Sequence, residues 1–341
     1  MKAALLPELP ADSLRVVNHP DPVPAGGELL VAVTACGICG TDLHILAGES
    51  YRPHLPFVLG HEPVGTVLSA GSADGEAWVG RRVTITIFTG CGRCEQCRGG
   101  DERLCQVRSQ ATGVLERWGG FAERMVISLS QAVDVPGGLA DANVAVLVDA
   151  GATAANAVRA VPATDGRAGA AVVAGGGPVG WLVAELLRLD GHEVTVVEPL
   201  PDRRAGVARL GYRVAPTLGD VHDRISVVVD CAGGEGIVPW GLERLDPRGA
   251  LVVVGYRTVR EANFSFIARK ELTVCGVRSG SREDLLRVLD LASSGRIRLP
   301  PVTTWPLEEI NDAFTALRRG EVAGKAVITV AANALAGNSH D

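Results

Sequence analysis

The pattern of apolar and polar positions changes once along this chain, between about residues 155 and 168. Residues 1 to about 155 carry short β-type runs, such as ELLVAVTA at 28–35 and RRVTITIF at 81–88, between turns rich in Pro and Gly. This pattern is typical of a mostly β region. From about residue 168, short apolar runs alternate with helical stretches: AAVVA, EVTVV, ISVVVD, GALVVVG and LTVCG. Strands that are apolar throughout predict a parallel sheet covered by helices on both faces, which is a doubly wound α/β domain.

The last part of the chain, from about residue 293 to 330, predicts an amphipathic helix followed by a strand. It holds PVTTWPLEEINDAFTALRRGEVAGKAVITV at 301–330, which fits an extension of the second domain and equally a return to the first. The pattern alone leaves both open. A length of 341 residues predicts two domains, each able to bury a core.

Composition and charge narrow the class of partner. The chain is 47% hydrophobic, has a formal net charge of −6 and contains no block of basic residues. We therefore expect a small-molecule partner, and neither nucleic acid nor an anionic membrane surface. The first residues lack the pattern of a secretory signal, and no stretch of about 20 residues is free of charge, Gly and Pro, so we expect a cytoplasmic protein without a membrane span.

A glycine-rich turn joins the first apolar run of the second domain to a helical stretch. In AAVVAGGGPVGWLVAELL, three glycines have the GxGxxG spacing of a dinucleotide-binding loop. Gly175 would allow the tight turn, Gly177 the close approach of a pyrophosphate, and Gly180 the packing of helix on strand. Pro178 and Val179 lie at the helix N-terminus, which faces the anion. A tight turn without a ligand is the alternative.

The next apolar run is followed by an acid, Glu198. A carboxylate at this place accepts hydrogen bonds from the ribose 2′-hydroxyl and repels a 2′-phosphate, so we expect NAD rather than NADP. Arg203 is a further candidate contact to the cofactor. Together with Arg204 it weakens the preference for NAD, because an arginine there can accommodate the 2′-phosphate.

Four of the eight cysteines fall in one short segment, CGRCEQCRGGDERLC. They are Cys91, Cys94, Cys97 and Cys105. Four thiolates close a tetrahedral shell around zinc, and a reducing cytosol favours metal binding over disulfides. An iron–sulfur cluster is one alternative, but the ferredoxin-type run continues with x3-C-P, which is missing here. Free core cysteines are the other, and charged neighbours disfavour it. We expect a structural zinc ion.

Two stretches nearer the N-terminus carry further residues suited to zinc chemistry. They are ACGICGTDLH at 35–44 and GHEPVG at 60–65. Cysteine and histidine are ligands that zinc accepts, and a catalytic zinc site needs three protein ligands and one open position. A second, catalytic metal site is therefore predicted in the first domain.

With CGICGTDLH, GHEPVG, the four-cysteine segment, GGFAE and GGGPVG in this order, the chain resembles the zinc-dependent medium-chain dehydrogenase/reductase family over essentially its whole length. The family includes alcohol, polyol and threonine dehydrogenases. The resemblance implies a GroES-like catalytic domain, residues 1–155 completed by 293–341, and a Rossmann NAD-binding domain, residues 156–292. It also implies a homodimer or homotetramer.

The resemblance implies roles for individual residues as well. Cys39 and His61 fall on ligands of the catalytic zinc, and Glu62 falls beside the metal, where it is an alternate ligand in some members. Asp149 falls where the family usually has a third ligand, Cys or Glu; direct coordination by Asp149 is expected, with water or Glu62 as the alternative.

Thr41 falls on the hydroxyl that bonds the reacting oxygen, and His44 on the histidine that passes the proton towards solvent. The expected reaction transfers a hydride between a secondary alcohol (a polyol, aminocyclitol or amino alcohol) and NAD, with two zinc ions per subunit. A zinc-free NADPH quinone or enoyl reductase, and a non-catalytic NAD- or zinc-binding protein, are the alternatives. Tyr51, His54 and Trp118 are expected at the substrate pocket because they lie near these motifs.

Overall fold

The structure, a computed structural model, describes residues 1–107, 110–162, 169–222, 224–256 and 262–330. The chain separates into two compact units, Met1–Asp149 with Pro301–Asp341, and Ala150–Pro300. It crosses between them after Asp149 and after Pro300, whereas the sequence analysis predicts boundaries at 155/156 and 292/293. Residues 331–341 of the predicted C-terminal segment lie outside the described residues.

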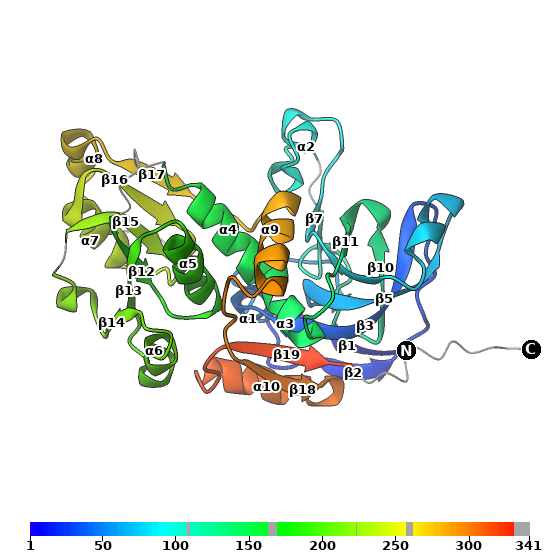
Figure 1. The fold of residues 1–341 in the computed structure, drawn as a ribbon. Coiled ribbons are helices and arrows are strands. Elements are labelled where there is room, and N and C mark those ends of the chain that lie inside the picture. The colour runs from blue at the N-terminus through cyan, green and yellow to red at the C-terminus, as the bar shows by residue number, and fades with distance from the viewer. Residues whose placement is uncertain (108–109, 163–168, 223, 257–261, 331–341) are drawn as a thin grey trace, which may run out of the picture. The chain divides into compact units, whose positions relative to one another are not determined.

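The first unit is built on a seven-stranded sheet with the order β11-β6-β5-β3-β19-β18, in which β10 also pairs with β3. In this sheet β19, near the end of the chain, pairs antiparallel with the second half of β3, near its beginning (Figure 1). The strands of this sheet are β3 (Glu28–Ile38), β5 (Glu62–Ala70), β6 (Arg82–Ile85), β10 (Arg124–Ser128), β11 (Ala132–Asp134), β18 (Val302–Pro306) and β19 (Lys325–Thr329).

Two three-stranded sheets complete the first unit, with the orders β2-β1-β4 and β7-β8-β9. Their strands are β1 (Lys2–Leu6), β2 (Arg15–Asn18), β4 (Phe57–Val58), β7 (Phe88–Thr89), β8 (Gln110–Thr112) and β9 (Glu116–Arg117). The helical elements of this unit are α1 (Gly40–Leu46), η1 (Ala73–Trp78), α2 (Glu95–Arg98), η2 (Glu102–Leu104), η3 (Leu129–Gln131), α3 (Asp141–Val146), η6 (Leu307–Glu309) and α10 (Ile310–Arg318).

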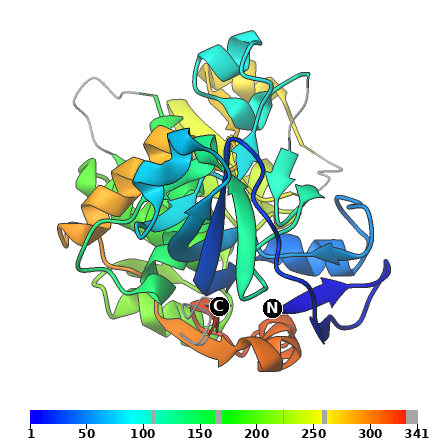
Figure 2. The same cartoon turned by 90° about the vertical axis from the view of Figure 1, so that its right-hand side faces the viewer.

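The two ends of the chain share the apolar core of the first unit. Phe121 and Phe314 are fully buried, and their rings meet edge to face with centroids 6.0 Å apart. The side chain of Asn311 on α10 bonds the backbone N–H and C=O of buried Leu14 at 2.9 and 3.0 Å. Figures 1 and 2 both show α10 beside the N-terminal strands. The C-terminal segment therefore completes the first unit.

The second unit is a six-stranded parallel sheet with the order β14-β13-β12-β15-β16-β17. Successive strand residues point to opposite faces, and both Val172 and Val173 are at most 1% exposed, so helices cover both faces. This is the doubly wound order of dinucleotide-binding domains, and it confirms the predicted fold class. Its strands are β12 (Ala170–Ala174), β13 (Glu193–Val197), β14 (Arg213–Ala215), β15 (Ile225–Asp230), β16 (Leu245–Val253) and β17 (Thr273–Gly276).

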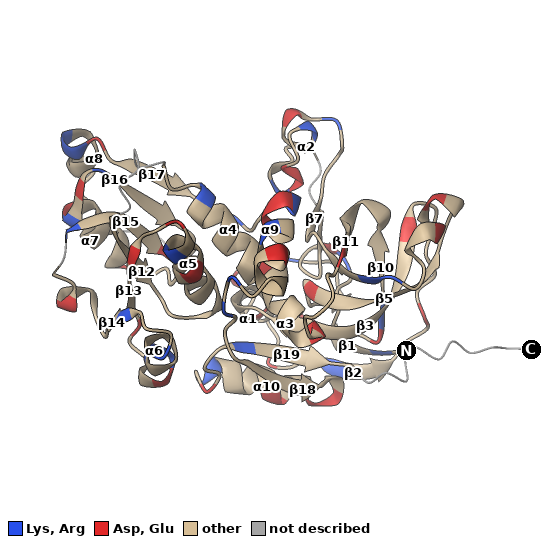
Figure 3. Ribbon diagram, viewed as in Figure 1, with Lys and Arg blue, Asp and Glu red and all other residues tan. Residues whose placement is uncertain are grey.

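The helices of the second unit follow the strands in alternation. They are α4 (Ala152–Arg159), α5 (Pro178–Leu189), α6 (Pro201–Ala208), η5 (Leu218–Asp220), α7 (Ile237–Arg244), α8 (Ser265–Lys270) and α9 (Arg282–Ser293), and α4 begins where the π-helical turn η4 (Leu147–Gly151) ends. Acidic and basic residues are interspersed on the elements of both units (Figure 3). None of the helices in the described ranges is both long and apolar enough to span a bilayer.

Candidate metal and dinucleotide sites

Four side chains predicted around the catalytic metal lie together in the first unit. Cys39, His61, Glu62 and Asp149 each offer one ligand atom, and these atoms lie within 4.8 Å of one another. Asp149 Oδ2 is 3.4 Å from Cys39 Sγ and 3.7 Å from His61 Nε2. The structure therefore brings the predicted ligands, Asp149 included, into one group.

The elements explain why these residues meet. Cys39 caps α1 directly after β3, and Glu62 opens β5, which pairs with β3. Asp149 lies in the π-helical turn η4, whose wider turn is an irregularity found mostly at functional sites. A strand-to-helix junction, a loop-to-strand junction and a helix-to-helix junction thus meet at the ligand group.

The chemistry of this donor set fits zinc. Thiolate sulfur, imidazole nitrogen and carboxylate oxygen are its usual protein ligands. Burial opposes a charge on His61, but Asp42 and Asp149 raise the pKa of His61 well above its usual value, so its surroundings favour a cation. Burial would raise the pKa of Asp149, but the hydrogen bond and charge of His61 lower it to about 2. Buried side chains whose charges favour a cation are expected at a metal site.

Asp42 supports two of the ligands. Its Oδ2 accepts a hydrogen bond from the backbone N–H of Cys39 at 2.8 Å, and its Oδ1 lies 3.4 Å from His61 Nδ1. A carboxylate behind a ligating histidine fixes the ring orientation and raises its basicity. In the sequence, Asp42 lies within the ACGICGTDLH motif, and its position three residues after the helix-capping Cys39 is the local signal for this role.

Lys325 is the residue that sequence reasoning missed. At the start of β19, its Nζ lies 2.6 Å from Glu62 Oε1, and the side chains are 4% and 0% exposed. Although burial opposes the charge, Glu62 raises the pKa of Lys325, which keeps the ammonium protonated. The other carboxylate oxygen, Glu62 Oε2, is buried and has no hydrogen-bond partner among the residues that the structure describes. A lysine 263 positions away in the sequence gives no local signal.

The two relay residues both lie on α1. Thr41 Oγ1 is 3.8 Å from Cys39 Sγ, so the hydroxyl is next to the ligand group. His44 lies one turn further along and is exposed, with Nδ1 2.8 Å from Glu49 Oε2. Their roles in proton transfer stay a prediction.

The four clustered cysteines also meet. The Sγ atoms of Cys91, Cys94, Cys97 and Cys105 lie within 4.8 Å of one another, and none forms a disulfide. Cys94 Sγ is 3.4 Å from Cys97 Sγ and 3.9 Å from Cys105 Sγ. A tetrahedron of Zn–S bonds of about 2.3 Å has edges of about 3.8 Å, so these separations suit a zinc ion.

The glycine loop of the second unit joins β12 to α5. Gly175 follows β12 with φ +102°, a conformation that L side chains rarely adopt. A Cβ on Gly180 would lie 1.8 Å from the carbonyl oxygen of Gly175, so only glycine lets α5 pack this closely. Gly177 caps α5, with Pro178 as the first helical residue, and a Cβ there would meet nothing within 4 Å. Open space at Gly177 suits an approaching ligand.

The predicted role of Glu198 is to bind the ribose 2′-hydroxyl. In the structure, its carboxylate accepts hydrogen bonds from the backbone near the glycine loop. Its Oε2 accepts a hydrogen bond from Gly176 N at 2.7 Å and its Oε1 one from Leu200 N at 2.9 Å. The carboxylate is thus fixed against the glycine loop and braces it. Arg204 Nη1 donates to the carbonyls of Glu198 and Pro199, both at 2.8 Å, whereas the contact of Arg203 with a cofactor stays a prediction.

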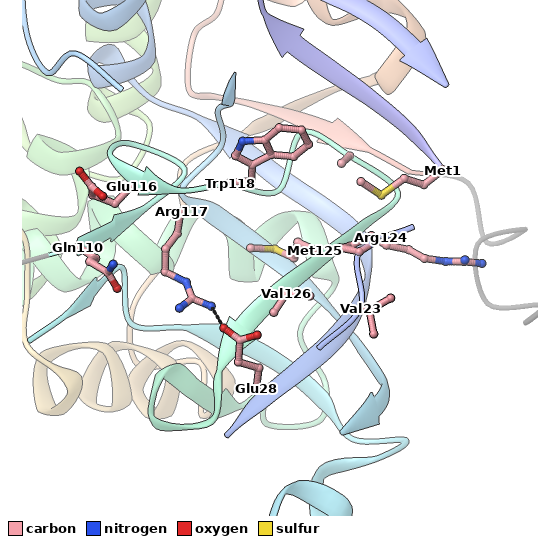
Figure 4. A pocket seen from close by; sticks show the side chains of 13 residues that line it. Met1, Val23, Glu28, Gln110, Glu116, Arg117, Trp118, Arg124, Met125 and Val126 are labelled. Carbon is pink, nitrogen blue, oxygen red and sulfur yellow. Dashed lines mark hydrogen bonds and ion pairs between the residues drawn. The ribbon is translucent and has the colours of Figure 1, made fainter. Parts of the chain in front are cut away.

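Trp118 lies on a surface cavity of about 400 Å³ in the first unit (Figure 4). Met1, Val23 and Met125 form apolar parts of its wall, and the Arg117–Glu28 ion pair closes one side at 2.7 Å. None of the metal-ligand candidates lines this cavity. A role for Trp118 in substrate binding stays a prediction without support from this geometry.

Comparisons with known proteins agree with the geometry. A model of the alcohol dehydrogenase GroES-like domain matches residues 25–137, and one described as zinc-binding dehydrogenase matches residues 207–328. The chain is 31% identical to an alcohol dehydrogenase of Geobacillus stearothermophilus, covering 96% of this chain and 98% of the relative. It is 28% identical to an L-threonine 3-dehydrogenase of Saccharopolyspora erythraea, covering 95% and 98%.

A solved structure has a similar fold along nearly the whole chain. Acetophenone reductase from Geotrichum candidum, in complex with NAD, superposes with a TM-score of 0.86 at 25% identity, covering 96% of each chain. The chain belongs to the zinc-dependent medium-chain dehydrogenase family. Its reaction class is that of an NAD(P)-dependent alcohol dehydrogenase.

Proposed function

We propose that this protein oxidises a secondary alcohol bearing a neighbouring hydroxyl or amino group, with NAD as hydride acceptor. The observation that carries the proposal is the buried group of Cys39, His61, Glu62 and Asp149, whose ligand atoms lie within 4.8 Å of one another. A zinc ion held there would supply Lewis acidity, which makes loss of the hydroxyl proton possible near neutral pH.

The ion pair between Lys325 and Glu62 supports three ligands and one withheld carboxylate. The thiolate of Cys39 and the carboxylates of Asp149 and Glu62 carry three negative charges, which the +2 of zinc and the +1 of Lys325 offset. Lys325 holds one oxygen of Glu62 and so competes with the metal for that carboxylate. Cys39, His61 and Asp149 then leave one coordination position open, as catalysis requires.

The chain's own residues would handle the proton. Thr41 Oγ1 accepts it from the substrate hydroxyl and passes its own proton on, and exposed His44 delivers a proton to solvent. Asp42 keeps the imidazole of His61 and the backbone of Cys39 in place. General acid–base transfer of this kind contributes about 10² to 10⁴-fold to a rate.

The four-cysteine group would hold a second, structural zinc. All four positions of a tetrahedral ion would be filled by sulfur, leaving none for a substrate. The segment from Cys91 to Cys105 has only the short elements α2 and η2, so the ion would supply the cross-link that a core provides elsewhere.

NAD is proposed over NADP because Glu198 places a fixed carboxylate at the end of β13. The bracing bonds to Gly176 and Leu200 keep it from turning away from a 2′-phosphate, whose charge it repels. Gly175, Gly177, Pro178, Val179 and Gly180 would line the pyrophosphate.

A homodimer or homotetramer in the cytoplasm is proposed as well. Within the described residues β17 pairs only with β16, at the edge of the parallel sheet, and its Val274 is 41% exposed. An exposed edge strand is a template for pairing with a second chain. The free cysteines suit a reducing compartment.

The experiment is a panel of polyols, aminocyclitols and amino alcohols, assayed by NADH absorbance with zinc measured on the same sample. We expect turnover with NAD and two zinc ions per subunit. Cys39→Ser should abolish turnover and retain NAD binding, whereas undiminished turnover in metal-depleted Cys39→Ser would refute the proposal. Turnover of quinones with NADPH in zinc-free protein would favour the reductase alternative.

A further inference from the structure

The end of α1 is shaped so that Glu49 returns to His44. Gly48, just past the helix, has φ +70°, the left-handed conformation of a helix C-cap glycine. The N–H of Gly48 donates to Ile45 O and the N–H of Glu49 to His44 O, both at 2.9 Å. This pair of bonds is a Schellman cap, and it holds the backbone of Glu49 against His44.

The side chains of the same two residues are also joined. Glu49 Oε2 lies 2.8 Å from His44 Nδ1. An ionised carboxylate only accepts hydrogen bonds, so in this contact Nδ1 carries the proton. In neutral histidine the other nitrogen, Nε2, is then the acceptor.

This matters because a relay histidine must first accept a proton. The hydrogen bond that one ring nitrogen makes decides which nitrogen is free. A hydrogen-bond acceptor that keeps the proton on Nδ1 leaves Nε2 unprotonated and able to accept the relayed proton. A histidine with its proton on Nε2 must first rotate its ring or change tautomer.

We propose that Glu49 is a positioning residue of the proton relay: it selects the His44 tautomer with a free Nε2 and pairs with the imidazolium that forms. The inference rests on the proposed function. In the step, Nε2 accepts the proton that comes by way of Thr41, Nδ1 keeps its own, and the Nε2 proton then leaves to water or buffer base. No electrons are transferred, and His44 returns to the starting tautomer.

The exposure of His44 and Glu49 sets the size of the expected change in kcat. The side chains of His44 and Glu49 are 56% and 63% exposed, so their mutual attraction is weakened by solvent. Exposed pairs are worth about 1.5- to 5-fold in an equilibrium, and we expect kcat to fall by about that factor when the carboxylate is removed. The binding of substrate should be unchanged.

The test combines nitrogen NMR with kinetics on the intact enzyme. Protein with ¹⁵N-labelled histidine rings gives a two-bond spectrum that distinguishes Nδ1–H from Nε2–H, and the His44 signals are identified by their loss in His44→Asn. Wild type should show the Nδ1–H form. Glu49→Ala should shift His44 towards Nε2–H and lower kcat about 1.5- to 5-fold with KM unchanged, while the matched control Glu76→Ala at another exposed glutamate changes neither.

A second variant tests the same inference if Glu49→Ala fails to fold. Gly48→Ala leaves Glu49 intact but strains the cap at φ +70°, with only ordinary contacts to Pro10. It should shift the tautomer and kcat in the same direction.

Wild-type His44 in the Nε2–H form, an unchanged tautomer in Glu49→Ala, or a switched tautomer with unchanged kcat would each overturn the inference. The tautomer is read without turnover. A wild type that oxidises no alcohol would therefore sink the proposed function, while the NMR result still reports on Glu49.

Discussion

Replacing Lys325 by methionine tests how the metal group keeps one position open. Lys325 and Glu62 form a buried ion pair at 2.6 Å, with side chains 4% and 0% exposed. Removing one partner of such a pair costs about 3–5 kcal/mol, because the other charge stays buried without compensation. Burial already raises the pKa of Glu62 to about 7, so this carboxyl can take up a proton, and we expect a loss near the lower end of that range.

The same change should alter the zinc site. Without Lys325, both oxygens of Glu62 are available to the metal, and Glu62 becomes the fourth ligand. We therefore expect Lys325→Met to retain zinc against a chelator at least as well as wild type and to lose most of its turnover, because the open position is filled.

Urea unfolding of metal-depleted protein measures the first effect, and zinc release to a chelator together with NADH formation measures the second. Lys2→Met is the matched control, since Lys2 pairs with Glu308 on the surface; it should change none of the three. Adding Glu62→Gln to Lys325→Met should restore part of the stability, as expected for partners in contact. Unchanged urea midpoint, zinc retention and turnover in Lys325→Met would refute the role assigned to this pair.

Three further predictions follow from other sites. Asp149→Asn should reduce the zinc content from two to about one per subunit and abolish turnover; two retained zinc ions by mass spectrometry would show that Asp149 is not a ligand. Cys97→Ser should remove the structural zinc and lower the melting temperature while NAD still binds, which fluorescence titration checks. Burial would raise the pKa of Glu185, but Arg298 and Tyr212 lower it, so its contribution to stability is complete above about pH 4.5 and is lost as the pH falls further. Glu185→Gln should therefore flatten the decline of the melting temperature in acid, and a decline as steep as that of wild type would contradict this.

The local sequence predicts much of the fold and part of the metal and dinucleotide sites. The apolar runs gave the parallel sheet, because strands buried on both faces carry no polar alternation. The GxGxxG spacing gave the loop at Gly175 to Gly180, where a left-handed turn and a 1.8 Å approach admit only glycine. The spacing of Cys91, Cys94 and Cys97 sets their proximity within one short segment.

The pattern of apolar and polar positions does not show which domain the C-terminal segment joins, because an amphipathic helix and a strand fit either one. The family resemblance implies its return to the first domain, the pairing of β19 with β3 shows it, and the same pairing brings Lys325 to Glu62. The bracing of Gly176 by Glu198 likewise depends on two strands lying side by side. The sequence by itself determined the elements and the residue types that chemistry needs, since short-range spacing controls both. The tertiary structure decided which distant charges meet, because burial and ion pairing depend on contacts between segments that no local pattern records.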